Sequence, residues 1–218
     1  MRVTSSEFSD FSFQIEELHR FIMHEIHGAA DHISTINDPR VAIEHLAGTF
    51  FGLDLANDAK LVAPGDVPPP FHGLLVHNEH MTTSLEEYHG QPVRLEVIED
   101  RLDRDMYWRK ILLCVGENQV VEVGVVRIHL RYTSDAVREE ILHRERPLGE
   151  ILIRHNVLRR IEPKWFFKFE SPSPVVAAFD RPIEGPVYGR VGLIHCDGQP
   201  AIELLEVVSG DCLSEPRT

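Results

Sequence analysis

A predicted hairpin near the C-terminus constrains the fold of this chain more than any other feature. The dipeptide Asp197-Gly198 lies between two runs in which apolar residues alternate with other residues. Asp-Gly is a favoured two-residue hairpin loop, because both positions accept a positive φ at low cost. We therefore predict two antiparallel strands joined at this turn, with Cys196 paired with Gln199.

Further strand-like and helix-like segments precede this hairpin. Strand patterns cover residues 93–97, 106–114, 120–130 and 164–170, and helix patterns cover residues 82–89, 134–142 and 147–153. Thr83 and Glu86 match a capping box, and Gly90 is a helix stop. Because helices are inserted between strands without strict alternation, the order favours an α+β fold with a mostly antiparallel sheet.

The first 65 residues have a different pattern. Apolar residues recur at helical spacing at Ile15, Leu18, Ile22 and Ile26, and Asp38-Pro39 is typical of a second helix start. Residues 62–71 are rich in proline and glycine, which is typical of a linker or surface crossing. We predict an N-terminal helical extension over residues 1–65 and an α+β domain over residues 66–218.

Charge and composition exclude several classes of protein. The net charge is −13, and an acidic surface repels nucleic-acid phosphates and anionic lipid, so we expect neither as a partner. No apolar run approaches the roughly 18–20 residues that a membrane span needs. The opening residues lack the apolar core of a secretory signal, so we expect a cytoplasmic protein. Three widely spaced cysteines predict neither a disulfide framework nor a thiolate zinc site.

Standard catalytic motifs are missing from the sequence. There is no glycine-rich phosphate loop, no GxSxG and no HExxH. His19, His24, His27 and His32 crowd the first predicted helix, but the His24-Glu25 pair lacks a histidine four residues after His24. We expect packing or surface roles for these histidines, and we expect no metal and no cofactor.

Two glutamates in the last predicted strand are candidate functional residues. With a two-residue loop, Glu206 lies opposite Gly189 on an apolar face, and Glu203 shares the other face with Arg190. Glu203 is then a surface ion pair of little energetic value. Glu206 must have its pKa raised by desolvation or must meet a buried cation. It is therefore a candidate acid or half of a structural pair, and both interpretations stay open, as does the choice between Glu206 and Glu203 as the pocket carboxylate.

Arg109 is the candidate cation. It shares a strand face with Tyr107, Ile111 and Leu113, where a guanidinium is costly unless a carboxylate meets it. One interpretation is an internal salt bridge to a core glutamate. The other is a two-pronged contact with the carboxylate of a substrate, which guanidinium geometry suits well.

Residues 74–208 resemble the chorismate pyruvate-lyase family. The resemblance lies in the order of LLVHNEHMTTSLEE, YWRKILLC, a strand with an internal Gly124, RPLGEIL and DGQPAIELLEV. It implies the α+β fold that this family shares with the UTRA effector domains of transcription regulators. The first 65–70 residues fall largely outside it.

The resemblance also implies the site residues. It places substrate-binding roles at Met81, Arg109, Gly124 and Leu148, and catalytic roles at Arg109 and Glu206. Glu206 matches only if one extra residue follows the hairpin turn, because Leu205 otherwise takes that position. The chain departs from the family pattern at Val125, where an arginine is expected.

The implied activity is a lyase reaction that converts chorismate to 4-hydroxybenzoate and pyruvate. Arg109 would position the substrate, and Glu206, held protonated, would donate a proton to the departing enolpyruvate oxygen. The alternative is a non-catalytic module of the same fold that binds a small carboxylate. A homodimer is compatible with the N-terminal helices, and the small carboxylate chorismate is the expected ligand.

Overall fold

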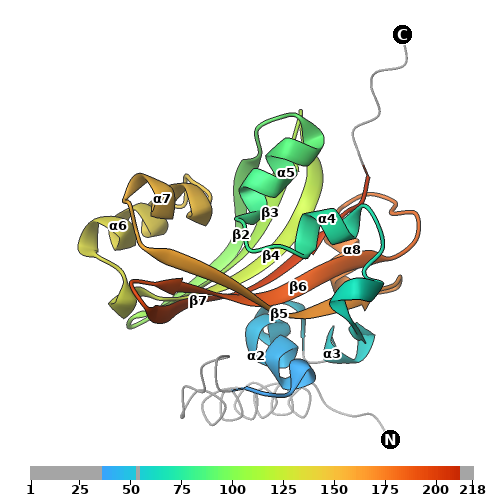
Figure 1. Cartoon of the computed structure of the whole chain (residues 1–218), viewed down its shortest axis with the longest axis horizontal. Helices are drawn as coiled ribbons and strands as arrows, with labels where there is room; N and C mark the ends of the chain where they lie inside the picture. The colour runs from blue at the N-terminus through green and yellow to red at the C-terminus, as the bar shows by residue number, and fades with distance from the viewer. Residues whose placement is uncertain (1–35, 53–54, 212–218) are drawn as a thin grey trace, which may run out of the picture. The chain divides into compact units, whose positions relative to one another are not determined.

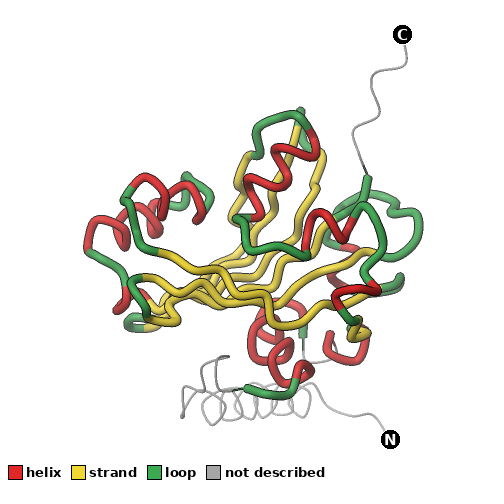
Figure 2. Tube along the Cα trace, in the orientation of Figure 1, coloured by secondary structure: helices red, strands yellow, loops and turns green. Residues whose placement is uncertain are grey.

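The computed structural model describes residues 36–52 and 55–211, and the chain from Ile36 onward forms one compact unit. A seven-stranded sheet crosses this unit (Figures 1 and 2), and every neighbouring pair of strands is antiparallel. Its order is β1-β5-β6-β7-β4-β3-β2. The strands are β1 (Lys60–Val62), β2 (Arg94–Asp103), β3 (Met106–Val115), β4 (Gln119–His129), β5 (Arg159–Phe169), β6 (Val187–Cys196) and β7 (Gln199–Val208). The expected α+β fold with an antiparallel sheet is confirmed.

Helices cover both faces of the sheet. They are α2 (Pro39–Phe51), α3 (Leu55–Asp58), α4 (Phe71–Leu75), α5 (Met81–His89), α6 (Asp135–His143), α7 (Leu148–Arg154) and α8 (Pro174–Ala177), with short 3-10 turns at Pro64–Asp66 and Leu130–Tyr132. In Figure 1, α4 to α7 lie on one face, and α2 and α3 lie on the other. The face beneath α4 to α7 carries two apolar clusters, one under α6 and α7 and one under α4 and α5.

Several predicted helix ends are confirmed because they depend on local hydrogen bonds. The Asp38 side chain accepts a hydrogen bond from the Arg40 amide at 2.8 Å, and Ser134 accepts one from Val137 at 3.4 Å. Gly90 ends α5 in the left-handed conformation, with φ at 64°. Each of these signals acts within a few residues, so the sequence alone could reveal it.

The expected capping box before α5 is wrong. The helix begins at Met81, its N-cap is His80, and Thr83 lies inside the helix. Glu86 does not bond back to the helix start, because its side chain accepts a hydrogen bond from the Val93 amide at 3.1 Å. That hydrogen bond links α5 to the residue just before β2.

The C-terminal hairpin has the predicted turn, but its register changes after two pairs. Cys196 pairs with Gln199 and His195 with Pro200, after which Ile194 pairs with Ile202. Ala201 is therefore an extra residue on β7, which makes a β-bulge. Beyond the bulge every residue of β7 faces a partner one position away from the predicted one.

The start of the described chain belongs to the same unit as the rest. Residues 36–65 contain α2, α3 and β1, and β1 pairs with β5, so the boundary expected near residue 65 falls inside this unit. The predicted helix over Ile15 to Ile26 and its histidines lie outside the described residues. Cys114 and Cys196 are buried free thiols, and Cys212 lies outside the described residues. Of the helices that the structure describes, none has the length and apolarity needed to cross a membrane.

Candidate functional site

A small cavity of about 40 Å³ lies between the sheet and the first turns of α5 and α7. Its floor comes from β3, β4, β6 and β7. The lining residues are His80, Met81, Thr82, Arg109, Ile111, Leu113, Glu122, Val126, Pro147, Leu148, Gly149, Ile194, Leu204 and Glu206. The cavity therefore combines a mostly apolar wall with three charged side chains.

Arg109 is a buried guanidinium with unused hydrogen-bond donors. The side chain is 1% exposed, and its Nε and Nη1 atoms have no hydrogen-bond partner among the described residues. Burial lowers its pKa from 12.5 to about 10, and only Tyr107 and Asp100 oppose this shift. Asp100 itself makes an ion pair with Arg144 at 2.9 Å. The chain thus keeps an uncompensated positive charge at the wall of the cavity.

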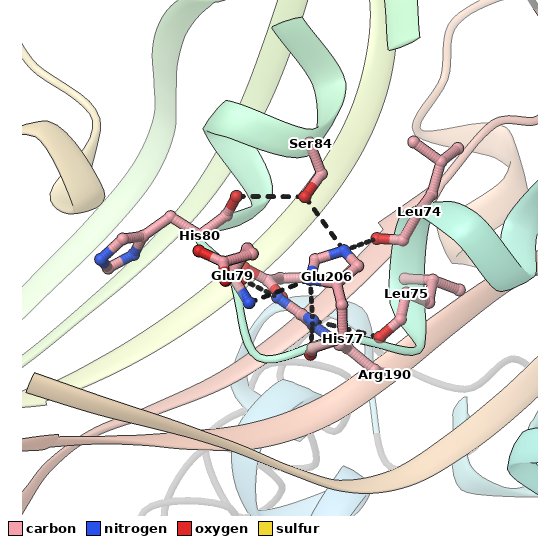
Figure 3. A network of polar contacts seen from close by, with 8 residues as sticks. All are labelled: Leu74, Leu75, His77, Glu79, His80, Ser84, Arg190 and Glu206. Carbon is pink, nitrogen blue, oxygen red and sulfur yellow. Dashed lines mark hydrogen bonds and ion pairs between the residues drawn. The ribbon is translucent and has the colours of Figure 1, made fainter. Parts of the chain in front are cut away.

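Glu206 makes its ion pair with Arg190 and not with Arg109. The Nε atom of Arg190 donates to Glu206 Oε2 at 2.6 Å, as Figure 3 shows. The two residues are direct cross-strand partners between β6 and β7. Of the two interpretations left open for Arg109, an internal salt bridge does not involve Glu206, because the buried cation that Glu206 meets is Arg190.

The bulge at Ala201 explains this outcome. Without it Glu206 would lie opposite Gly189, as the two-residue loop predicts, but the extra residue brings it opposite Arg190. A register shift of one position gives each β7 residue a partner from the other set of alternating β6 residues, so a different set of side chains shares its face of the sheet.

Glu203 is buried on the opposite face of the sheet. It lies opposite Leu193 on β6 and opposite Arg127 on β4, and it forms an ion pair with Arg127. The surface ion pair expected with Arg190 is wrong, because the shifted register places Arg190 on the Glu206 face. Of the two glutamates, Glu206 lines the cavity.

Arg190 is held by backbone oxygens of the segment that leads into α5. Its Nη1 atom donates to the carbonyl oxygens of Leu75 and His77 at 3.1 and 3.0 Å, and Nη2 donates to that of Glu79 at 3.2 Å. Figure 3 shows this segment wrapped around the guanidinium. Arg190 therefore fixes the start of α5 over the sheet and is itself well satisfied.

Glu122 is a third charged group of the cavity, and the sequence prediction missed it. This β4 side chain is 2% exposed, and its Oε2 atom has no hydrogen-bond partner among the described residues. Burial raises its pKa well above the ordinary value, the negative charge of Glu206 raises it further, and Arg190 lowers it. The available signal was a single glutamate in the apolar run VVEVGVV, two residues before Gly124 and so on the same face.

The other predicted site residues lie at the same place. Met81 and Leu148 begin α5 and α7 and line the cavity. Gly124 lies on β4 between Glu206 and Ile111, and a Cβ there would stand 2.9 Å from Ile111 Cγ1. The fold therefore brings Met81, Arg109, Gly124, Leu148 and Glu206 together, although their roles stay predictions.

His80 separates the cavity from a larger outer cleft. The cleft has a volume of about 590 Å³ and is lined by residues 78–80 and 156–161. The Nε2 atom of His80 accepts a hydrogen bond from Arg159 Nε at 2.7 Å, and the ring stands over Gly149. Burial, followed by the charges of Arg159 and Arg190, lowers the pKa of His80 to about 4. The ring is therefore neutral near pH 7.

Within residues 36–52 and 55–211, no three His, Cys, Asp or Glu side chains are close enough to hold an ion. The charged groups of the cavity are suited instead to an organic anion with hydrogen-bonding oxygens.

Comparison with known proteins assigns the chain to no family. No protein-family model and no curated protein matches the sequence. Solved structures with a similar arrangement include PhnF from Mycobacterium smegmatis, with a TM-score of 0.47, 10% identity and coverage of 62% of this chain and 66% of that chain, just under two thirds. The effector domain of PhnF from the same organism has a TM-score of 0.44 at 10% identity, over 63% of this chain and 95% of that chain. At this level of likeness they indicate neither a ligand nor an activity for this chain, and membership of the chorismate pyruvate-lyase family stays a prediction.

Proposed function

We propose that this protein binds a small organic carboxylate in the cavity, with Arg109 as the partner of the carboxylate. The observation that carries the proposal is the buried guanidinium whose Nε and Nη1 atoms have no partner among the described residues. A planar guanidinium can donate two parallel hydrogen bonds to one carboxylate. The carboxylate of such a ligand would balance the positive charge of Arg109.

The charge balance of the cavity favours a ligand with one negative charge. Arg190 and Glu206 neutralise each other, and burial together with the charge of Glu206 raises the pKa of Glu122, which favours its neutral form. Arg109 then contributes the one uncompensated charge among the described groups that line the cavity. The start of α5 adds partial positive charge from its first backbone amides.

The size of the cavity shapes how a ligand would enter. A volume of about 40 Å³ is smaller than a substituted ring, so the apolar side chains at the starts of α5 and α7 must move aside. Met81 is suited to this movement, because an unbranched thioether side chain repacks at low cost. Ile111, Leu113 and Leu148 would then contact the apolar body of the ligand.

A lyase that converts chorismate to 4-hydroxybenzoate and pyruvate is the second candidate function. The observation that favours it is the buried carboxyl of Glu122 in the same cavity, whose raised pKa favours the protonated form, since elimination of enolpyruvate requires a proton for the leaving oxygen. Two observations place it second. Glu206, the expected proton donor, is bound to Arg190, and chorismate carries two negative charges against one uncommitted guanidinium.

Calorimetric titration tests the first candidate. Benzoate should bind to the wild-type protein and its neutral analogue benzamide should not, and Arg109→Met should abolish benzoate binding. Arg138→Met is the matched control, because Arg138 lies outside the cavity in an exposed ion pair with Asp105. Failure of every small carboxylate to bind, or equal binding to Arg109→Met, would refute the proposal.

A coupled assay separates the two candidates. The purified protein is incubated with chorismate, and pyruvate is measured with lactate dehydrogenase and NADH. Binding without pyruvate release supports the binding module. Pyruvate release that is lost in Arg109→Met and kept in Arg138→Met supports the lyase.

A further inference from the structure

The two edges of the sheet differ in length. At one edge β1 has only three residues. The opposite edge is β2, which has ten residues and, within the described part of the chain, pairs with β3 alone (Figure 1). A strand of ten residues is about 33 Å long, so β2 presents a long row of backbone N–H and C=O groups to any strand that lies beside it.

A β-bulge lies near the middle of β2. Val97 is opposite Ile111 on β3. The next pair is Glu99 with Lys110, so Ile98 is an extra residue. Because an extra residue shifts the alternation of faces by one position, even-numbered residues before the bulge share a face with odd-numbered residues after it. The cavity face therefore carries residues 95, 97, 100 and 102, and the opposite face carries residues 94, 96, 99, 101 and 103.

The bulge makes β2 complementary to an antiparallel copy of itself. When two copies are centred on the bulge, the residues that meet lie on the same face, as a two-fold axis perpendicular to the sheet requires. A strand without the bulge would place the members of each pair on opposite faces. Cross-strand pairs of opposite charge or of apolar side chains are favourable. The pairs that meet are Arg94 with Asp103, Leu95 with Leu102, Glu96 with Arg101 and Val97 with Asp100.

The side chains of this edge are accessible to a second chain. Ile98 is 51% exposed and Leu102 is 49% exposed, and both are apolar. Arg94 and Glu96 contact each other at 2.5 Å, but this ion pair is exposed and so has little energetic value to lose. At the axis Glu99 meets the partner's Glu99, and this contact of like charges opposes pairing. The edge therefore favours a reversible dimer over a permanent one.

Charges and bulges also protect sheet edges from other strands, but the pattern on β2 differs from that of a protected edge. Protection relies on very short strands, on proline or on charges that repel an approaching strand. The other side of the sheet uses the first two, because β1 is short and the part of β5 beyond it contains Pro163. β2 is long, has no proline, and has charges of both signs in an order that matches its own reverse. This order favours a second copy of the chain over an unrelated strand.

We propose that β2 is a dimerisation edge, where a second copy of this chain pairs antiparallel about a two-fold axis through the bulge. The backbone hydrogen bonds would supply the affinity, and the charge pairs would fix the register. The two sheets would join into one, and both cavities would lie on the same face of it. No residue of β2 lines the cavity, so this inference does not depend on the proposed function.

Sedimentation velocity of the full chain at increasing concentration measures this association. Because the edge alone buries a small area, we expect a reversible dimer with a dissociation constant of about 10 µM. Arg101→Glu would place like charges opposite Glu96 on both sides of the axis, and it should raise the dissociation constant about tenfold. Glu96→Arg should raise it by a similar factor, although it changes the net charge in the opposite direction. A general effect of net charge could not weaken the dimer in both variants.

The double variant Glu96→Arg with Arg101→Glu restores the opposite charges in exchanged positions. Its dissociation constant should return to within about threefold of the wild-type value. Glu99→Gln removes the like charges at the axis and should tighten the dimer about twofold. Arg160→Glu is the matched control, because Arg160 is an exposed arginine of β5, near the opposite edge of the sheet, in an ion pair with Glu162. It should leave the constant nearly unchanged.

A chain that stays monomeric throughout the concentration series would overturn the proposal. The same holds for a dimer that Arg101→Glu leaves as tight as the wild type, or one that the double variant fails to restore. Slow hydrogen exchange of the β2 amides in a monomer would also contradict it, because another segment of the chain would then cover this edge. Melting temperatures check that every variant folds, as expected for substitutions on an exposed edge strand.

Discussion

Replacing Arg109 with methionine should make the folded protein more stable. The fall in the pKa of Arg109 from 12.5 to about 10 corresponds to a penalty of about 3 kcal/mol for keeping the side chain charged. Methionine has a similar length, fills the same apolar wall and carries no charge. Even the replacement of a buried ion pair by apolar side chains of similar volume often stabilises a protein by about 1–4 kcal/mol, and Arg109 lacks such a pair. We therefore expect Arg109→Met to raise the free energy of unfolding by about 2–3 kcal/mol.

The matched control is Arg190→Met on the same face of the sheet. Arg190 is also 1% exposed, but it pairs with Glu206 and donates to three backbone oxygens. Its loss leaves a carboxylate without its cation and carbonyl groups without donors, at a cost of about 3–5 kcal/mol. Two substitutions of the same type should thus have opposite signs, because one arginine has partners within the chain and the other lacks them.

Urea denaturation of both variants, without added ligand, measures the difference. For a unit of this size, about 1 kcal/mol corresponds to a shift of about 2–4 °C in melting temperature. Arg109→Met should therefore melt several degrees above the wild type, and Arg190→Met should melt well below it. If Arg109→Met is destabilised to a similar extent as Arg190→Met, the chain itself satisfies Arg109 and the reasoning fails.

Three further predictions concern the walls of the cavity and the opposite face. Because the pKa of His80 is held at about 4, below its ordinary 6.5, falling pH protonates the unfolded chain first. From about pH 7.5 to about pH 5.5 the wild type should lose about 1 kcal/mol more unfolding free energy than His80→Gln, and equal losses in urea titrations would contradict the neutral ring. Gly124→Ala brings a Cβ to 2.9 Å from Ile111 Cγ1, so it should lower the melting temperature and, by pushing Ile111 into the cavity, weaken benzoate binding about tenfold, whereas an unchanged dissociation constant would show that Ile111 does not contact the ligand. Glu203→Leu should lower the free energy of unfolding by about 3–5 kcal/mol because it leaves Arg127 without its buried ion-pair partner, and an unchanged denaturation midpoint would show that the pair adds nothing.

Features that depend on short stretches of chain could be predicted from the sequence. The turn at Asp197-Gly198, the end of α5 at Gly90 and the cap at Ser134 are each set by residues within a few positions. Runs rich in apolar and β-branched residues likewise predict the central strands, which are buried at nearly every residue. Together these signals are sufficient for the α+β class.

The register of the C-terminal hairpin could not be predicted from its turn alone. Ala201 is an ordinary small residue, and nothing in its type distinguishes a bulge from a regular pair. The bulge becomes favourable once Glu206 meets Arg190, and that pairing depends on backbone oxygens of Leu75 and His77, more than 100 positions away. A pairing that depends on such distant residues cannot be predicted from a local sequence pattern.

Only some residues of the site could be predicted, again because their partners come from distant parts of the chain. Arg109 and Glu206 stand out as charged residues on apolar strand faces, and both line the cavity. One interpretation left open for Arg109, a salt bridge to a core glutamate, does not apply to Glu206, because Glu206 pairs with Arg190 on the neighbouring strand. Glu122 has the same sequence signature and was overlooked, although it shares a face with Gly124. A single charge in an apolar strand indicates a site, but its partner depends on the strand order.

A crystal structure of the protein grown with a bromobenzoate would test the central claim most directly. Anomalous scattering from bromine locates the ring without ambiguity. The account predicts the ring in the cavity beneath the starts of α5 and α7 and the carboxylate within about 2.7–2.9 Å of the guanidinium nitrogens of Arg109, with Met81 and Leu148 displaced. A bromobenzoate bound only in the outer cleft beside Arg159 and Arg160, with Arg109 untouched, would contradict it.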